Sequence, residues 1–122
     1  MLQRHKDEFP YTKNESAIKV DSIRLDKFFR NKKLKPPIFM KIDVQGAELD
    51  VLESASDYIK NIDVIILEIS LVKLYQDTPT FDDLYQYLKI AGMNFVNIVD
   101  RLYSPENKKI LQFDAIFIRN YN

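Results

Sequence analysis

The spacing of hydrophobic and polar positions changes several times along the chain, and these changes predict alternating strands and helices. Apolar positions three to four residues apart predict helices at 25–33, 46–61 and 78–92. Alternating or short continuous apolar runs predict strands at 17–25, 37–44, 63–70, 94–104 and 110–120. The loop "PENKK" joins the last two runs directly, which is typical of a hairpin.

The segment 78–92 has the clearest helix boundaries. Thr80 suits the N-cap, Asp83 lies three residues later at the capping-box position, and Gly92 suits the position after the C-cap. The expected buried face consists of Phe81, Leu84, Leu88 and Ala91.

The order strand, helix, strand, helix, strand, helix, strand, strand predicts an α/β fold. Strands that alternate with helices form right-handed crossovers, so we expect a mostly parallel sheet covered on both faces, with an antiparallel final strand pair. In open sheets of this kind, ligands bind outside the carboxyl ends of the strands. We therefore look for chemistry at that edge of the sheet.

Composition narrows the class of protein. Hydrophobic residues make up 46% and charged residues 30% of 122 residues, which fits one small domain over 1–122 or a piece of a larger one, with a poorly ordered segment at 1–16. Eighteen basic residues balance eighteen acidic ones, so no bulk field favours nucleic acid. The longest apolar run, "VIIL" at 64–67, is too short to span a membrane.

Cysteine and histidine usage argues against several kinds of site. The chain has no cysteine, which excludes disulfides and thiolate ligands and fits a reducing, cytoplasmic location. The one histidine, His5, is in the polar N-terminal segment, so a histidine-based zinc site has little support. We predict no metal.

The stretch "FMKIDVQGAE" at 39–48 carries charges inside an apolar strand. The two-residue period of a strand places Lys41 and Asp43 on one face, and Glu68 on the matching face of the next strand. Two interpretations remain open for Lys41 and Glu68. They form a buried ion pair that keeps the strands in register, or they face a ligand cleft. Asp43 is nearest the strand end, which favours a functional role for its carboxylate.

Gly46 follows this strand and opens the next helix. A glycine there allows positive φ or a close approach of the backbone to a ligand, and the sequence leaves both interpretations open. Glu48, in the first helical turn, suits the helix dipole and is expected to be structural.

The stretch "KIDVQGAELDVLESA" resembles the FkbM-type methyltransferases. "IRLDKFF", "NIDVIILEIS", "LVKLYQDTPTFDDLYQYLKIAGMNFVNI" and "LQFDAIFIRN" are similar to the same family in the same order. The resemblance covers residues 18–119.

The resemblance implies the Rossmann-like class I methyltransferase fold. Residues 37–44 and 63–70 would be its fourth and fifth strands. Residues 94–104 and 110–120 would be its sixth and seventh, with the seventh beside the fifth.

The resemblance also implies an activity. This is methyl transfer from S-adenosylmethionine to an acceptor, usually a hydroxyl of a sugar, lipid or secondary metabolite. Asp43, Lys41 and Glu68 would be the catalytic residues. Asp43, Gln45 and Gly46 would contact the cofactor.

The family also has a glycine-rich turn after its first strand and an acidic residue ending its second, and neither is found in this chain. We therefore expect the C-terminal half of a methyltransferase domain. The strand at 37–44 would then keep an open apolar edge, which a second copy could pair with. The competing hypothesis is a non-catalytic remnant that dimerises or binds a protein. A nucleotide hydrolase is disfavoured because the phosphate-binding loop motif is missing.

Overall fold

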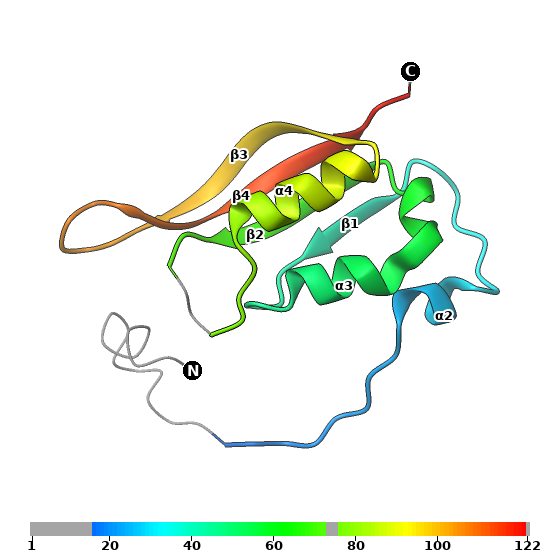
Figure 1. The fold of residues 1–122 in the computed structure, drawn as a ribbon, viewed down its shortest axis with the longest axis horizontal. Helices are drawn as coiled ribbons and strands as arrows, with labels where there is room; N and C mark the ends of the chain where they lie inside the picture. Colours follow the sequence, from blue (N-terminus) through cyan, green and yellow to red (C-terminus); the bar gives the residue numbers. More distant parts are fainter. Residues whose placement is uncertain (1–15, 73–75, 122) are drawn as a thin grey trace.

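A computed structural model describes residues 16–72 and 76–121. In chain order the elements are α2 (Leu25–Phe29), β1 (Phe39–Ile42), α3 (Glu48–Ala55), the 3₁₀ helix η2 (Ser56–Asn61), β2 (Val64–Ser70), α4 (Phe81–Ile90), β3 (Met93–Tyr103) and β4 (Ile110–Arg119). Figure 1 shows the arrangement. The three predicted helices and four of the five predicted strands are confirmed; most are shorter than predicted, and β3 has the predicted length but begins one residue earlier.

The four described strands form one mixed sheet in the order β1-β2-β4-β3. β1 and β2 are parallel, whereas β4 is antiparallel to both β2 and β3. The final strand therefore lies between the second and third, as the family resemblance implied. The expectation of a mostly parallel sheet is wrong for the described strands, because the last hairpin supplies two antiparallel pairings and only one crossover joins parallel neighbours.

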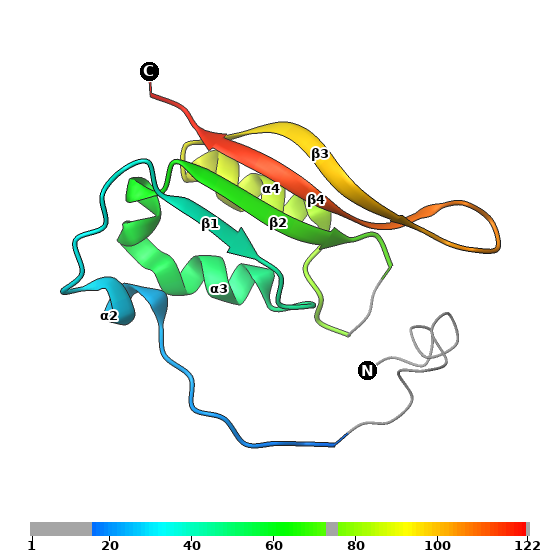
Figure 2. The same cartoon turned by 180° about the vertical axis from the view of Figure 1, so that it is seen from behind.

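Helices α3 and α4 lie on the same side of the sheet, and the opposite view shows strands in front of α4 with α3 beside β1 (Figures 1 and 2). In β2 the residues that face the helices, Ile65, Leu67 and Ile69, are fully buried, and the alternate residues are only half-buried. Within residues 16–72 and 76–121, helices thus cover one face of the sheet. The predicted coverage of both faces is not found there.

Helix α4 follows its sequence signals closely. The Thr80 hydroxyl accepts a hydrogen bond from the Asp83 backbone N–H, and the Asp83 carboxylate accepts one from the Thr80 backbone N–H. Leu84 and Leu88 are buried against the sheet. Gly92 ends the helix at φ +80°, a conformation that favours glycine. The predicted capping box and C-terminal glycine are confirmed.

The predicted strand at 17–25 is wrong. Residues 16–24 have no regular secondary structure and leave the body of the protein from the start of α2 (Figure 1). Their alternating pattern suits a strand, but a strand forms only when an edge is available to pair with it. The prediction for His5 and the prediction of poor order at 1–16 concern a segment of which the structure describes only Ser16. Residues 1–15 lie outside the described residues.

Arg119 organises the end of the sheet where β1 and β2 begin. Its guanidinium donates to three backbone carbonyls, at 2.5 Å to Ile59 O, 2.9 Å to Ile62 O and 2.5 Å to Ala91 O. These carbonyls belong to the ends of η2 and α4, where the last carbonyls commonly lack partners within the helix, although Ile59 O also accepts the Ile62 N–H. Burial lowers the pKa of the Arg119 guanidinium. One side chain thus fixes two helix ends to the last strand.

Candidate functional site

The turn after β1 has an unusual backbone. Gln45 has φ +51° and Gly46 has φ +112°, so two consecutive residues are in the left-handed region. Gln45 has a Cβ atom and carries a conformational cost there, whereas Gly46 is suited to it. Such local strain is found preferentially at functional sites. The predicted role of Gly46 in a positive-φ turn is confirmed.

Glu48 fixes this turn from the first residue of α3. The Gly46 backbone N–H donates to both oxygens of the Glu48 carboxylate, at 3.0 and 3.1 Å. Glu48 is only 4% exposed, so its carboxylate is committed to this contact and to the N-terminus of the helix. The expectation that Glu48 is structural fits this geometry.

An open pocket of about 620 Å³ lies over this turn, at the carboxyl end of β1. The turn from Asp43 to Ala47 forms one wall, α3 contributes Asp50, and the loop residues Gln76, Asp77 and Thr78 form another. Among the described residues, three carboxylates and two amides line the pocket, and no basic side chain does. The pocket is therefore polar and acidic.

Lys41 pairs with a residue that the sequence reasoning did not consider. Its Nζ lies 3.1 Å from Asp114 Oδ2, and Asp114 is buried in β4. The hydrogen bond and the charge of Asp114 raise the pKa of Lys41. Of the two interpretations left open for Lys41 and Glu68, the ion pair between them is not the one the structure has, because Lys41 pairs across β2 with Asp114, the residue opposite Glu68 in β4.

Glu68 lies half-buried beside other acids. Burial, followed by the charges of Asp43, Asp114 and Glu48, raises the pKa of Glu68, and the charge of Lys41 opposes this shift only as the smallest contribution. Glu68 therefore retains a proton to higher pH than an ordinary glutamate. A group of this kind can accept or release a proton nearer to neutrality.

The predicted site residues divide into two sets. Asp43, Gln45 and Gly46 line the acidic pocket, and Asp43 also borders a second groove together with Lys41. Glu68 lines neither, although its pKa responds to Asp43. The described residues contain no group of three or more histidine, cysteine or acidic side chains arranged to hold a metal ion. No helix among them is long and apolar enough to cross a membrane.

Sequence reasoning missed Asp114, Asp50 and residues 76–78. Asp114 interrupts the apolar run "ILQFDAIFIR" just as Lys41 interrupts "FMKI", and that parallel was the available signal. Asp50 follows Glu48 in the first turn of α3 and lines the same pocket as Asp43. The contribution of residues 76–78 depends on the path of a loop, which no periodic pattern predicts.

Comparison with known proteins gives a family. A search of curated proteins and a search of solved structures returned no match. The family model described as "Methyltransferase FkbM domain" matches residues 2–95, which is more than half of the chain. The match includes β1, the glycine turn, α3, β2 and α4, and therefore most of the pocket described above. The chain belongs to the FkbM methyltransferase family.

Proposed function

We propose that this protein transfers a methyl group from S-adenosylmethionine to a hydroxyl group of a sugar, lipid or secondary metabolite. The observation that carries the proposal is the acidic pocket at the carboxyl end of β1, built on the strained turn of a methyltransferase-family chain. The carboxyl ends of parallel strands are where open α/β sheets bind their ligands.

The donor set of the pocket fits this cofactor. S-adenosylmethionine carries a positive sulfonium, and the carboxylates of Asp43, Asp50 and Asp77 favour a cation nearby. Asp43, Gln45 and Gly46 would hold it, with carboxylate and amide groups available to its hydroxyl and amino groups. When bound, the cofactor supplies an electrophilic methyl group.

Asp43 is the proposed base. Its exposed carboxylate lines the pocket and could accept the proton of an acceptor hydroxyl, while the bound cofactor would supply the methyl group and leave as the neutral thioether. Positioning of the two reacting atoms supplies much of the rate in such a transfer. Lys41 would balance the local negative charge, and Glu68, whose pKa is raised in part by the charge of Asp43, would act on Asp43 through that charge.

The carboxylates of the pocket also bear on which acceptor molecules can bind. Three carboxylates without a basic partner among the described residues of the pocket lining disfavour phosphorylated or carboxylated acceptors, because like charges repel. A neutral polyhydroxylated or hydroxylated apolar acceptor suits the lining best.

The strand order supports the corresponding fold. In β1-β2-β4-β3 the last strand of the chain is inserted beside the second, as the seventh strand lies beside the fifth in a Rossmann-like methyltransferase. We propose that β1, β2, β3 and β4 correspond to the fourth, fifth, sixth and seventh strands of that fold. The absence of cysteine favours a cytoplasmic location.

The first test compares Asp43→Asn with the unchanged chain, using S-adenosylmethionine labelled in its methyl group and a panel of glycoside and hydroxylated lipid acceptors. We expect turnover to fall about 10²–10⁴-fold, the usual contribution of a general base. The thermal midpoint should not move, because Asp43 is exposed.

Asp57→Asn is the matched control, since Asp57 is an exposed aspartate on η2, away from the pocket. Its turnover should be unchanged. Equal turnover of Asp43→Asn and the unchanged chain would refute the role of Asp43. If the folded chain gave no calorimetric signal with S-adenosylmethionine, the non-catalytic hypothesis would replace the enzymatic one.

A further inference from the structure

We propose that the free edge of β1 binds residues 18–23 of a second copy as an antiparallel strand, and that two copies exchange these segments reciprocally. The inference does not depend on methyl transfer. β1 pairs with β2 along one edge, and no strand within residues 16–72 and 76–121 pairs along the other. An unpaired strand edge is a template for another chain.

The free edge opens into an apolar groove of about 620 Å³. It is lined by residues of α2, β1 and α3 and by their connections, most of them apolar, including Leu25, Phe29, Met40, Ile42, Val44 and Val51. Phe39 and Val44 are 60% and 42% exposed at its rim. A groove of this composition favours an occupant with apolar side chains on one face.

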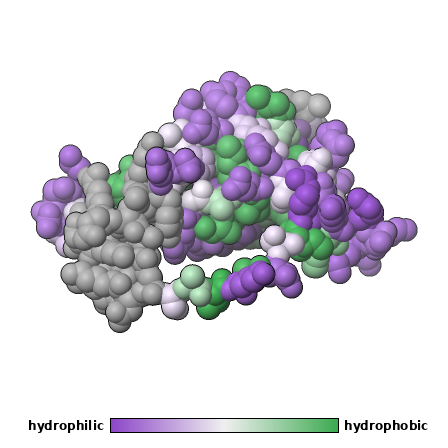
Figure 3. Space-filling model, turned by 60° about the horizontal axis from the view of Figure 1, so that its bottom comes forward, coloured by the Kyte–Doolittle hydropathy of each residue, from purple (hydrophilic) through white to green (hydrophobic). Residues whose placement is uncertain are grey.

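Residues 16–24 have the matching character. Ile18, Val20 and Ile23 are 80%, 73% and 64% exposed. Three β-branched apolar side chains so close together are unusual for a solvated linker and typical of a strand. Figure 3 shows this segment separated from the body, with hydrophobic side chains along it and hydrophobic surface on the side of the body that faces it.

One antiparallel register places the three apolar side chains of the segment opposite apolar residues. In this register residue 23 lies opposite residue 39. Because the strands are antiparallel, each step forward in the segment is a step backward in β1, so residue 22 lies opposite residue 40, and so on. The register places Ile18 beside Val44, Val20 beside Ile42 and Ile23 beside Phe39. Ile18 and Val20 then point to the face of β1 that carries the buried Ile42, toward the apolar groove.

The same register also matches opposite charges. Asp21 lies beside Lys41, and Lys19 lies beside Asp43. Opposite charges directly across an antiparallel pair stabilise it, and like charges destabilise it. A shift by two residues puts Asp21 beside Asp43 or Lys19 beside Lys41. The charges therefore select one register.

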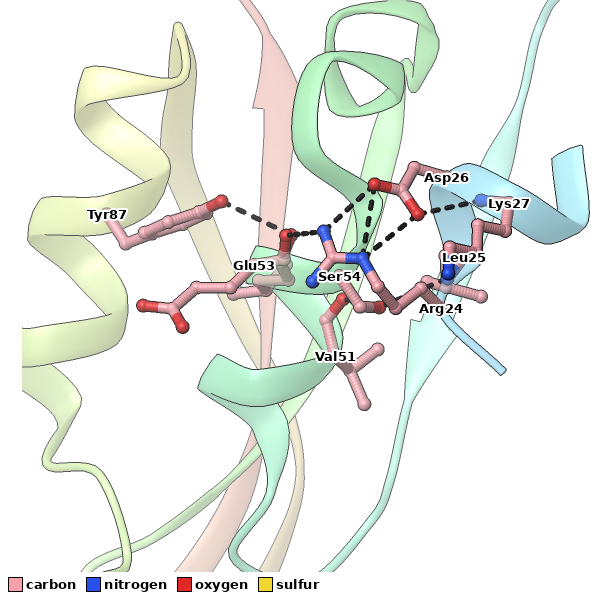
Figure 4. A network of polar contacts seen from close by, with 9 residues as sticks. Arg24, Leu25, Asp26, Lys27, Val51, Glu53, Ser54 and Tyr87 are labelled. Carbon is pink, nitrogen blue, oxygen red and sulfur yellow. Dashed lines mark hydrogen bonds and ion pairs between the residues drawn. The ribbon is translucent and has the colours of Figure 1, made fainter. Parts of the chain in front are cut away.

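The segment that fills the free edge of β1 comes from a second copy, because residues 18–23 of the same chain are held away from that edge. The Arg24 guanidinium donates to the Asp26 carboxylate, at 2.9 Å to Oδ2, and to Glu53 O at 3.4 Å (Figure 4). The Leu25 N–H donates to Ser54 Oγ at 3.3 Å. These contacts tie the chain to α3 just before α2, and the segment leaves from there toward solvent (Figures 1 and 2). Reciprocal exchange gives a two-fold dimer in which both edges are filled.

Light scattering over a concentration series tests the association. We expect a mass that rises from 14.4 kDa toward twice that value as the concentration increases. Val20→Asp places a charge in the apolar groove and should keep the chain monomeric. Ile90→Asp is the control, because Ile90 is 87% exposed on α4, away from β1, and the dimer should persist.

Engineered cysteines test the register, because the chain has none of its own. Lys19→Cys and Asp43→Cys variants, refolded together and oxidised, should form a disulfide-linked dimer. Ser22→Cys mixed with Asp43→Cys should not, since residue 22 lies opposite Met40 in this register. Circular dichroism of each variant shows that it folds.

Each other result contradicts the proposal. A monomer at every concentration excludes the dimer, and a dimer that survives Val20→Asp uses another surface. A Lys19→Cys/Asp43→Cys double variant that oxidises only within one chain shows that the edge is filled by its own segment. Equal crosslinking of Ser22→Cys and Lys19→Cys excludes the register.

Discussion

The two ends of the sheet carry buried or partly buried charge in opposite ways. At the end where β1 and β2 begin, Arg119 is surrounded by neutral carbonyls, and its donors are directed at three of them. At the other end, Lys41 is accompanied by Asp43, Glu68 and Asp114, so acids outnumber the base. The first end is saturated with hydrogen bonds, whereas the second retains unbalanced negative charge beside an open pocket.

This difference separates a structural arginine from a candidate functional site. A partly buried cation whose donors are directed at backbone carbonyls stabilises the fold and has little capacity left for a ligand. A cluster in which burial and like charges raise the pKa of Glu68 costs stability and can be offset by ligand binding. Substitutions at the two ends should therefore differ in sign and size.

The largest effect is expected from Arg119→Leu. The substitution removes the guanidinium from all three carbonyls, but Ile59 O keeps the hydrogen bond that it accepts from the Ile62 backbone N–H at 3.1 Å. The carbonyls of Ile62 and Ala91 lose this donor, and each unsatisfied acceptor costs about 1–3 kcal/mol. We expect the free energy of unfolding, measured by urea denaturation, to fall by at least about 2 kcal/mol.

Arg101→Leu is the control for this loss, because Arg101 is an exposed arginine of β3. Its stability should change by less than about 0.5 kcal/mol. If Arg119→Leu were equally mild, water would have to replace the guanidinium at all three carbonyls, and the contrast between the two ends would disappear.

A smaller loss is expected from Lys41→Met at the carboxyl end. The substitution removes the partner of the buried Asp114 carboxylate, and a hydrogen bond to a charged group contributes about 1.5–3 kcal/mol. Since the Lys41 side chain is half-exposed, solvent screens part of this, and we expect a loss smaller than that of Arg119→Leu in the same denaturation experiment.

Lys60→Met gives the comparison for that experiment. Lys60 also makes an ion pair, at 2.9 Å to Asp57, but both side chains are largely exposed. Exposed pairs contribute about 0–1 kcal/mol, so this variant should be close to the unchanged chain. Equal losses in the two variants would show that the burial of Asp114 does not matter.

The sequence predicted the elements with strong local signals and failed where long-range pairing decides. The capping box of Thr80 and Asp83 and the positive φ of Gly92 depend on neighbours within one helix, so they could be predicted. The segment 17–25 has equally clear alternation, but whether it forms a strand depends on an edge elsewhere in the molecule.

The candidate site shows the same division. Asp43 and Gly46 could be found because a strand end and a glycine turn are local features. The partner of Lys41 could not, because choosing Asp114 over Glu68 requires the parallel register of β1 with β2 and the insertion of β4 beside β2. The family resemblance implies that insertion, but the order of the strands alone does not specify which charged side chains meet across them.

The smallest effect is expected from Glu68→Gln, and it has the opposite sign. Because the pKa of Glu68 is raised above its ordinary value of 4.5, the folded chain binds this proton more tightly than the unfolded chain does. Ionisation of Glu68 therefore reduces stability as the pH rises through 4.5 to the folded-state pKa, and the neutral amide avoids that loss. In urea denaturation, Glu68→Gln should equal the unchanged chain near pH 4 and exceed it slightly near pH 7, with Glu106→Gln in the exposed hairpin loop as the matched control. A Glu68→Gln variant that is less stable at pH 7 would mean that the carboxylate is stabilised by its surroundings, and that the carboxyl end of the sheet is as well balanced as the end held by Arg119.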